Sequence, residues 1–255
     1  MSCNSRPVWI CGNSHTLALR NAWIKHPSNK KIDRVFALGS GKWMWEPFHR
    51  VGESGVQFIP DEFVANLEKA TGQNYLSQNY TWGFTIGGHT TRIYRNSIWQ
   101  TSMLSKQATD HERPISEGLF AALAHADNAP VLNFFKDLKE CGYDFFVVGA
   151  PPPHESNMTI SPNYPRSKLA MIEGAARKLF MHGLEELNVP YIKIPASTLA
   201  DDGLLLNRYK LEKRFDGKPD AHHANEEFGT LLLDEILKFI RTGSAETNYD
   251  VEQTN

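Results

Sequence analysis

The sequence predicts an α/β protein in which a mostly parallel five-stranded sheet lies between two layers of helices. Two observations predict this fold: short apolar runs bounded by turn residues, and longer segments between them in which apolar residues recur with helical spacing. Alternating strands and helices favour parallel βαβ units, because parallel neighbours need a long crossover connection. Ligands bind such sheets at the carboxyl ends of the strands, so a site is expected there.

Five runs are expected to form the strands. Each has four or five residues and contains β-branched or aromatic side chains, which favours a buried strand over a helix. The five are Val8–Cys11, Arg34–Leu38, Trp82–Ile86, Phe145–Val148 and Tyr191–Ile194.

Five segments are expected to form helices, and the clearest is Ser167–Leu187. In this segment Leu169, Ile172, Ala176 and Phe180 recur at spacings of three and four, the spacing of one helix face. The full set is Thr16–Lys25, Asp61–Ala70, Val131–Cys141, Ser167–Leu187 and Asn225–Ile240. The expected architecture is therefore a three-layer α/β/α domain around a flavodoxin-like sheet.

The composition is that of one globular domain. The chain has 255 residues, of which 41% are hydrophobic and 22% charged, and no Ser-rich or charged spacer interrupts the apolar segments. We expect a single domain over residues 1–242 and a loose tail over residues 243–255, where apolar periodicity ends.

Charge and cysteine content exclude several classes of partner. The 27 Lys and Arg residues are balanced by 29 Asp and Glu, so no basic surplus would neutralise a nucleic acid. Cys3, Cys11 and Cys141 show no CxxC spacing, which favours a reducing compartment. No run of 18 apolar residues and no signal peptide is recognisable. We expect a cytoplasmic protein without a membrane span, and leave its oligomeric state open.

Ser14 follows the first expected strand and opens the first expected helix. A serine at this position can attack a carbonyl carbon, while backbone N–H groups at the helix start stabilise the resulting oxyanion. The alternative interpretation is a helix N-cap, a position at which serine is common.

Asp220 and His223 lie three residues apart, just before the last expected helix. The carboxylate can bind one ring nitrogen while the other faces a nucleophile, as in serine hydrolases. A solvated loop and a helix start capped by Asn225 are alternatives. A metal site of Asp220, His222 and His223 is a further alternative, but no second ligand cluster has a convincing spacing, so no metal or other cofactor is expected.

At these positions the sequence resembles the SGNH hydrolase superfamily, the GDSL-like esterases and lipases, and in particular small bacterial members with GNSH after the first strand. Four blocks carry the resemblance, in the family's order: Val8–His15, Arg34–Gly41, Ile86–His89 and Asp220–Asn225, the last followed by Gly229. Asn13 stands where the first block normally has Asp, and His89 where the third block normally has Asn.

The resemblance implies an acyl-ester hydrolase with Ser14 as nucleophile, His223 as base and Asp220 as the residue that orients the base. The resemblance also implies an oxyanion hole formed by the backbone N–H groups of Ser14 and Gly41 and by the side chain at position 89. Neutral imidazole can donate one hydrogen bond, so His89 is a candidate donor; a structural loop histidine is the alternative.

Three residues are expected to contact the substrate: Asn13, Trp43 and His154. Trp43, with Trp45, can form an apolar or sugar-stacking wall, and His154 follows a stiff run of prolines at the end of a strand. The expected substrate is a small-molecule or carbohydrate acyl ester.

Three function classes remain open at this point. The first is an esterase or O-deacetylase, and the second is an O-acyltransferase that uses the same residues with a different acceptor. The third is a binding module, in which the change at His89 marks a lost activity and the pocket recognises a glycan or acyl ligand.

Overall fold

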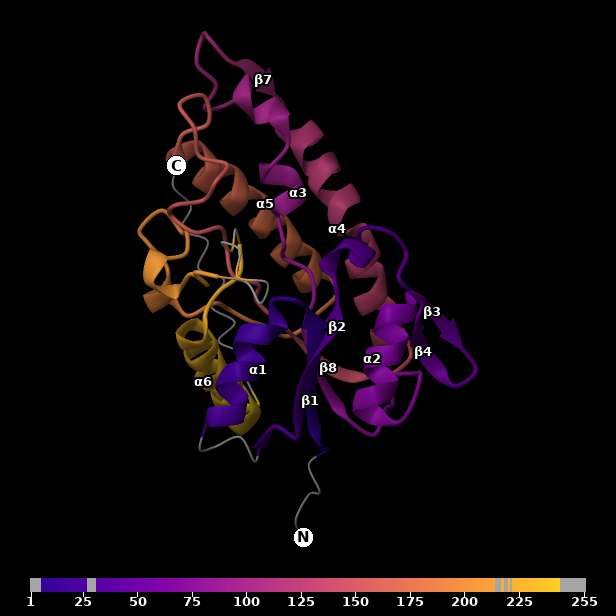
Figure 1. The fold of residues 1–255 in the computed structure, drawn as a ribbon. Coiled ribbons are helices and arrows are strands. Elements are labelled where there is room, and N and C mark those ends of the chain that lie inside the picture. Colours follow the sequence, from indigo (N-terminus) through magenta and orange to yellow (C-terminus); the bar gives the residue numbers. More distant parts are fainter. Residues whose placement is uncertain (1–5, 27–30, 214–216, 218–219, 221, 244–255) are drawn as a thin grey trace.

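The central sheet has five parallel strands in the spatial order β2–β1–β5–β8–β9 (Figure 1). The computed structural model describes residues 6–26, 31–213, 217, 220 and 222–243. All five predicted strands are present, and their order is the flavodoxin-like one. They are β1 (Val8–Asn13), β2 (Arg34–Gly39), β5 (Thr81–Thr85), β8 (Asp144–Val148) and β9 (Tyr191–Ile192).

Helices cover both faces of this sheet, which makes the predicted three layers (Figure 1). On one face α1 (Thr16–Lys25) packs beside α6 (Glu226–Thr242). The other face is covered by α2 (Asp61–Thr71), α4 (Glu117–Glu140) and α5 (Arg166–Glu186).

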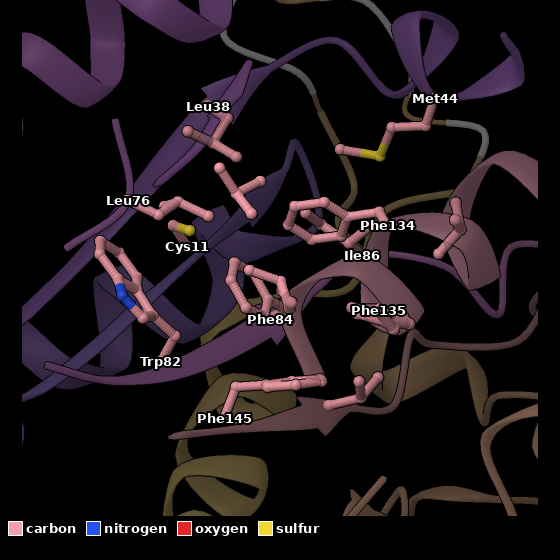
Figure 2. Packing of buried hydrophobic residues seen from close by; sticks show 14 of the residues in the cluster. Cys11, Leu38, Met44, Leu76, Trp82, Phe84, Ile86, Phe134, Phe135 and Phe145 are labelled. Atoms are coloured by element: carbon pink, nitrogen blue, oxygen red, sulfur yellow. The ribbon is translucent and has the colours of Figure 1, made fainter. Parts of the chain in front are cut away.

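Alternate strand residues supply the two cores, because successive side chains of a strand point to opposite faces. Ile10 packs with α1 and α6, whereas the next residue, Cys11, packs on the opposite face. Figure 2 shows that second core, where Phe84 lies 5.1 Å from Phe134 of α4 between ring centres. This aromatic packing holds α4 against β5, and the candidate site lies at the carboxyl end of β5 beside the middle of α4, at Asp127, Asn128 and Val131.

α4 is much longer than predicted. The apolar spacing in the sequence predicted a helix over Val131–Cys141 only. The observed helix starts at Glu117, and Ser116 caps it by accepting the N–H of Leu119 at 3.2 Å. Pro130 therefore lies inside α4.

Several short elements were not predicted. Among the strands, β3 (His49–Gly52) and β4 (Gly55–Phe58) form an antiparallel hairpin, and β6 (Ser102–Leu104) pairs with β7 (Arg113–Ile115). Among the described residues the helical additions include α3 (Thr91–Tyr94) and the 3₁₀ segments η2 (Gly41–Trp45), η3 (Ser97–Gln100), η4 (Ala196–Thr198) and η5 (Asn207–Tyr209).

Two expectations concern residues outside the described part of the chain: Cys3 and the tail beyond Gly243. Gly243 itself ends α6 with a φ of 68°, in the left-handed conformation that glycine favours. None of the helices within the described residues is long and apolar enough to cross a lipid bilayer.

Candidate active site

The candidate site lies at the carboxyl ends of β1 and β5, where the strand order changes direction. This switch point is the usual ligand position in an open α/β sheet. A cavity of about 300 Å³ opens there. Its wall includes Ser14, Gly41, Trp45, His89, Arg92 and His222, which come from segments far apart in the sequence.

Three of the expected site residues form a hydrogen-bonded line. His223 Nε2 lies 2.9 Å from Ser14 Oγ, although 209 positions separate the two residues in sequence. The other ring nitrogen of His223, Nδ1, lies 2.7 Å from Asp220 Oδ2. The fold brings them together because α1 starts directly after Ser14, α6 starts just after His223, and the two helices pack against each other.

Asp220 is held as a carboxylate by its surroundings. It is buried, and its Oδ1 accepts the backbone N–H groups of His222 at 2.8 Å and of His223 at 2.6 Å. Burial by itself raises the pKa of Asp220, but these N–H groups and the His223 ring outweigh it, and the pKa lies below its ordinary value. A carboxylate anchored in this way can fix the orientation of the His223 ring.

The turn before α1 presents the Ser14 hydroxyl to the cavity. The N-cap of α1 is His15, so Ser14 Oγ does not serve as the cap and is bonded to His223 instead. Asn13 shapes the turn: its Oδ1 accepts the N–H of His15 at 3.0 Å, and its Nδ2 lies 4.0 Å from Met44 Sδ. Asn13 is only 1% exposed but belongs to the cavity wall, so its contact with a substrate stays a prediction.

His89 reaches the cavity through a turn that requires glycine. Gly87 and Gly88 have φ values of 84° and 65°, and a Cβ on Gly87 would lie 2.6 Å from the Phe180 ring. The His89 ring stacks on His15 with 4.1 Å between ring centres. Its buried Nε2 has no hydrogen-bond partner among the described residues.

His15, His89 and His222 are rings of low basicity. Burial, followed by the charge of Arg177 and of neighbouring histidines, lowers the pKa of His89 to about 3. Burial and His223 lower the pKa of His222 to about 4. Burial also lowers the pKa of His15 well below its ordinary value. The three rings are therefore neutral around pH 7.

We expect these rings to make the folded state acid-sensitive. Each ring has a pKa near 6.5 in the unfolded chain. In the folded chain the pKa of His222 is about 4 and that of His89 about 3, so these rings stay neutral to lower pH. Their stabilising contribution is complete above pH 6.5 and is lost as the pH falls, by about 1.4 kcal/mol per pH unit for each ring. Urea unfolding between about pH 7.5 and pH 5 measures this loss.

Two variants give the matched comparison for this experiment. His89→Gln removes a buried ring and should flatten the pH dependence, whereas His182→Gln replaces a 65% exposed ring and should leave it unchanged. A wild-type free energy of unfolding that is constant over this range would contradict the expectation.

The structure corrects the expectation for Trp43. Its indole N–H donates to Glu62 Oε2 at 2.8 Å, and it does not belong to the cavity wall. Trp45 lines the cavity instead, with the Arg92 guanidinium 5.0 Å from its ring centre. Both tryptophans lie in the 3₁₀ segment η2, whose three residues per turn direct positions two apart to different sides.

The structure also corrects the expectation for His154. This side chain is 1% exposed and lies outside the cavity wall, so it cannot meet a substrate there. Burial lowers its pKa, and the charges of Lys210, Asp220 and His223 also act on it. His154 is thus a buried neighbour of the Asp220–His223 pair.

The sequence analysis missed several residues of the cavity wall. Arg92 binds Asp127 across the cavity wall at 3.1 Å, and the sequence offers no signal that links the two. His222 was named in the sequence only as a candidate metal ligand and His15 only as the end of the first block, so their place in the cavity wall was not predicted. Arg95 and Lys42 add two more cations to the wall.

Comparisons with known proteins find similarity at the level of solved structures. No family model and no curated protein matches the chain. A GDSL-like lipase from Bacteroides thetaiotaomicron is 10% identical, with 94% of this chain and 89% of that chain covered and a TM-score of 0.42. A phospholipase A1 from Streptomyces albidoflavus is 13% identical, with 90% and 98% covered and a TM-score of 0.45.

A third similar structure is the periplasmic domain of a lipopolysaccharide acetyltransferase from Salmonella ser. Paratyphi A. It is 13% identical, with 93% of this chain and 84% of that chain covered and a TM-score of 0.49. Chains described as GDSL-like lipases and SGNH hydrolases recur among the structures similar to this one.

Proposed function

We propose that this chain is a serine-dependent hydrolase of acyl esters, an esterase or O-deacetylase of the SGNH type. The observation that carries the proposal is the line of hydrogen bonds from Asp220 through His223 to Ser14, which ends at a cavity. A buried carboxylate that binds one imidazole nitrogen, with a hydroxyl on the other, is the arrangement that activates a serine.

In the proposed reaction Ser14 Oγ attacks the acyl carbonyl carbon while His223 Nε2 takes its proton. His223 then gives that proton to the oxygen of the departing alcohol, and the acyl group stays on Ser14. Water attacks this acyl-serine as His223 accepts a proton from the water. The proton passes to Ser14 Oγ, and a carboxylic acid leaves.

Three groups are proposed to bind the oxyanion: the N–H groups of Ser14 and Gly41, and the ring of His89. Gly41 and His89 both border the cavity next to Ser14. Because the pKa of His89 is about 3, the ring is neutral and carries one N–H. A neutral imidazole as hydrogen-bond donor to a developing oxyanion has precedent in enzymes. Its free, buried Nε2 supports this role.

Replacing His89 with Ala is expected to lower kcat by about 100-fold with little change in KM, because the donor acts mainly in the transition state. His89→Asn should retain more activity than His89→Ala, since a carboxamide is also a donor. Steady-state kinetics on one ester at alkaline pH measures both effects, because unperturbed imidazole is neutral there. Equal kcat for the three proteins would assign His89 a structural role.

The direct test of the proposed function is chemical labelling of Ser14. A fluorophosphonate probe should modify Ser14, and peptide mapping should locate the label; p-nitrophenyl acetate should be hydrolysed by the same preparation. Ser14→Ala should lose both, whereas Ser40→Ala, which removes the other serine of the cavity wall, should keep the label. No labelling and no hydrolysis would favour a binding module, and transfer to an added alcohol in place of water would favour an acyltransferase.

A further inference from the structure

Three histidine rings converge beside the Ser14 hydroxyl. His15 comes from the start of α1, and His222 and His223 come from the segment before α6. One ring nitrogen of each lies within 4.8 Å of the other two. The sequence suggested Asp220, His222 and His223 as a metal site with no second ligand cluster, and the fold brings His15 to the two histidines in place of Asp220.

The ring nitrogens in this cluster are available to a ligand. His15 Nδ1 and His222 Nδ1 are both buried and have no hydrogen-bond partner among the described residues. An unpaired buried polar atom is unfavourable, so a ligand that pairs with both nitrogen atoms is favoured. His223 Nε2 faces the same space and contacts Ser14 Oγ.

The surroundings of His223 suit a metal ligand as well as a base. Histidines that bind metal usually donate their second ring N–H to a carboxylate, and Asp220 Oδ2 lies 2.7 Å from His223 Nδ1. A buried cation near the cluster, Arg177, is neutralised by Glu173 at 2.6 Å. The positive charge of a metal ion would therefore meet the Asp220 carboxylate, the paired guanidinium of Arg177 and the guanidinium of Arg95, whose charge also reaches His222.

We propose that His15, His222 and His223 bind a divalent transition-metal ion such as Zn²⁺, and that the bound ion inhibits the hydrolase. Three imidazoles with water in a fourth position form a common tetrahedral zinc site. Zn–N bonds of about 2.0–2.1 Å place the nitrogens about 3.3 Å apart, so the rings close by up to about 1.5 Å through side-chain rotation. Inhibition follows because the ion takes the lone pair of His223 Nε2 that deprotonates Ser14.

The binding part of this proposal depends on the geometry of the three rings alone, and the inhibition rests on the proposed function. Binding is measured on the full chain after chelator treatment, by competition for Zn²⁺ with a chromophoric chelator. Wild type should bind one ion per chain. His222→Gln should bind it at least tenfold more weakly, and His15→Gln provides a second variant if the first does not fold. His182→Gln, an exposed histidine outside the cluster, should match wild type.

Inhibition is measured as hydrolysis of p-nitrophenyl acetate with and without Zn²⁺ for each protein, so that differences in basal rate cancel. Activity of wild type should fall in proportion to occupancy and return with EDTA, and EDTA alone should leave it unchanged. His222→Gln should keep its activity at Zn²⁺ concentrations that inhibit the wild-type protein.

The outcomes separate the two parts. Equal affinity in wild type and both cluster variants would exclude the site. Stoichiometric binding that leaves hydrolysis unchanged, or that activates it, would overturn the inhibition. A chain that binds Zn²⁺ through His222 but never hydrolyses an ester would contradict the proposed function and the inhibition together, and leave the binding site standing.

Discussion

Replacing Ser14 with Ala is expected to lower kcat for an acyl ester by about 10⁶-fold, and the double variant Ser14→Ala/His223→Ala should lose no more than that. The reason is that the Ser14 hydroxyl and the His223 ring, which lie 2.9 Å apart, take part in the same proton transfer. Without the hydroxyl, the ring has no nucleophile to deprotonate. Each single variant therefore removes nearly the whole effect. Single-turnover kinetics with a chromogenic ester measures wild type, Ser14→Ala, His223→Ala and the double variant.

Comparing the double variant with the two single variants shows whether Ser14 and His223 act together or independently. If the two single losses multiplied in the double variant, the residues would contribute independently, and the proposed proton transfer from Ser14 to His223 would be wrong. Circular dichroism of each variant is the control, since neither substitution removes a core residue.

Gly229→Ala is expected to destabilise the fold by about 3 kcal/mol, the upper part of the usual range for overpacking. Gly229 lies in α6, and a Cβ there would be 2.1 Å from the backbone oxygen of Ala18 in α1. No side-chain rotation can relieve a contact with backbone, so the two helices must move apart. Urea unfolding gives the free energy, and kcat should fall as well because Ser14 lies just before α1 and His223 just before α6.

Gly174→Ala is the matched control for this substitution. Gly174 is also inside a helix, α5, but a Cβ there would meet no atom within 4 Å. This variant should be stabilised by about 0.5–1 kcal/mol, because Ala has the higher helix propensity. If Gly229→Ala were as stable as Gly174→Ala, the close approach of α1 and α6 would not exist in solution.

The elements that the sequence predicted are those whose signal is local. β1 and α1 follow from a run of apolar residues and a helical spacing, and α1 was predicted with the observed bounds. The predicted start of α4 at Val131 was wrong, because the helix begins at Glu117 and continues through Pro130. Tertiary packing supports it on both sides of the proline, where Phe120, Ala124, Val131, Phe134 and Phe135 are all buried.

The candidate site shows the same division. Ser14, Asp220 and His223 were singled out because each lies at a position where a local pattern indicates chemistry. The stacking of His15 on His89, and the cavity contact of Trp45 in place of Trp43, depend on how separate segments meet. The periodicity of apolar residues does not show which distant segments contact each other, so these contacts could not be derived from the sequence.

The packing of α1 against α6 has a consequence for the order in which the protein gains its activity during synthesis. A ribosome makes β1 and Ser14 near the beginning, but the base and its carboxylate come about 209 residues later. Any nascent chain that stops before Asp220 holds a serine hydroxyl with neither the base nor its carboxylate. The proposed activity therefore requires α6 to dock on α1, and we expect a C-terminal truncation that removes α6 to abolish it, because α6 packs directly against α1 and starts just after His223.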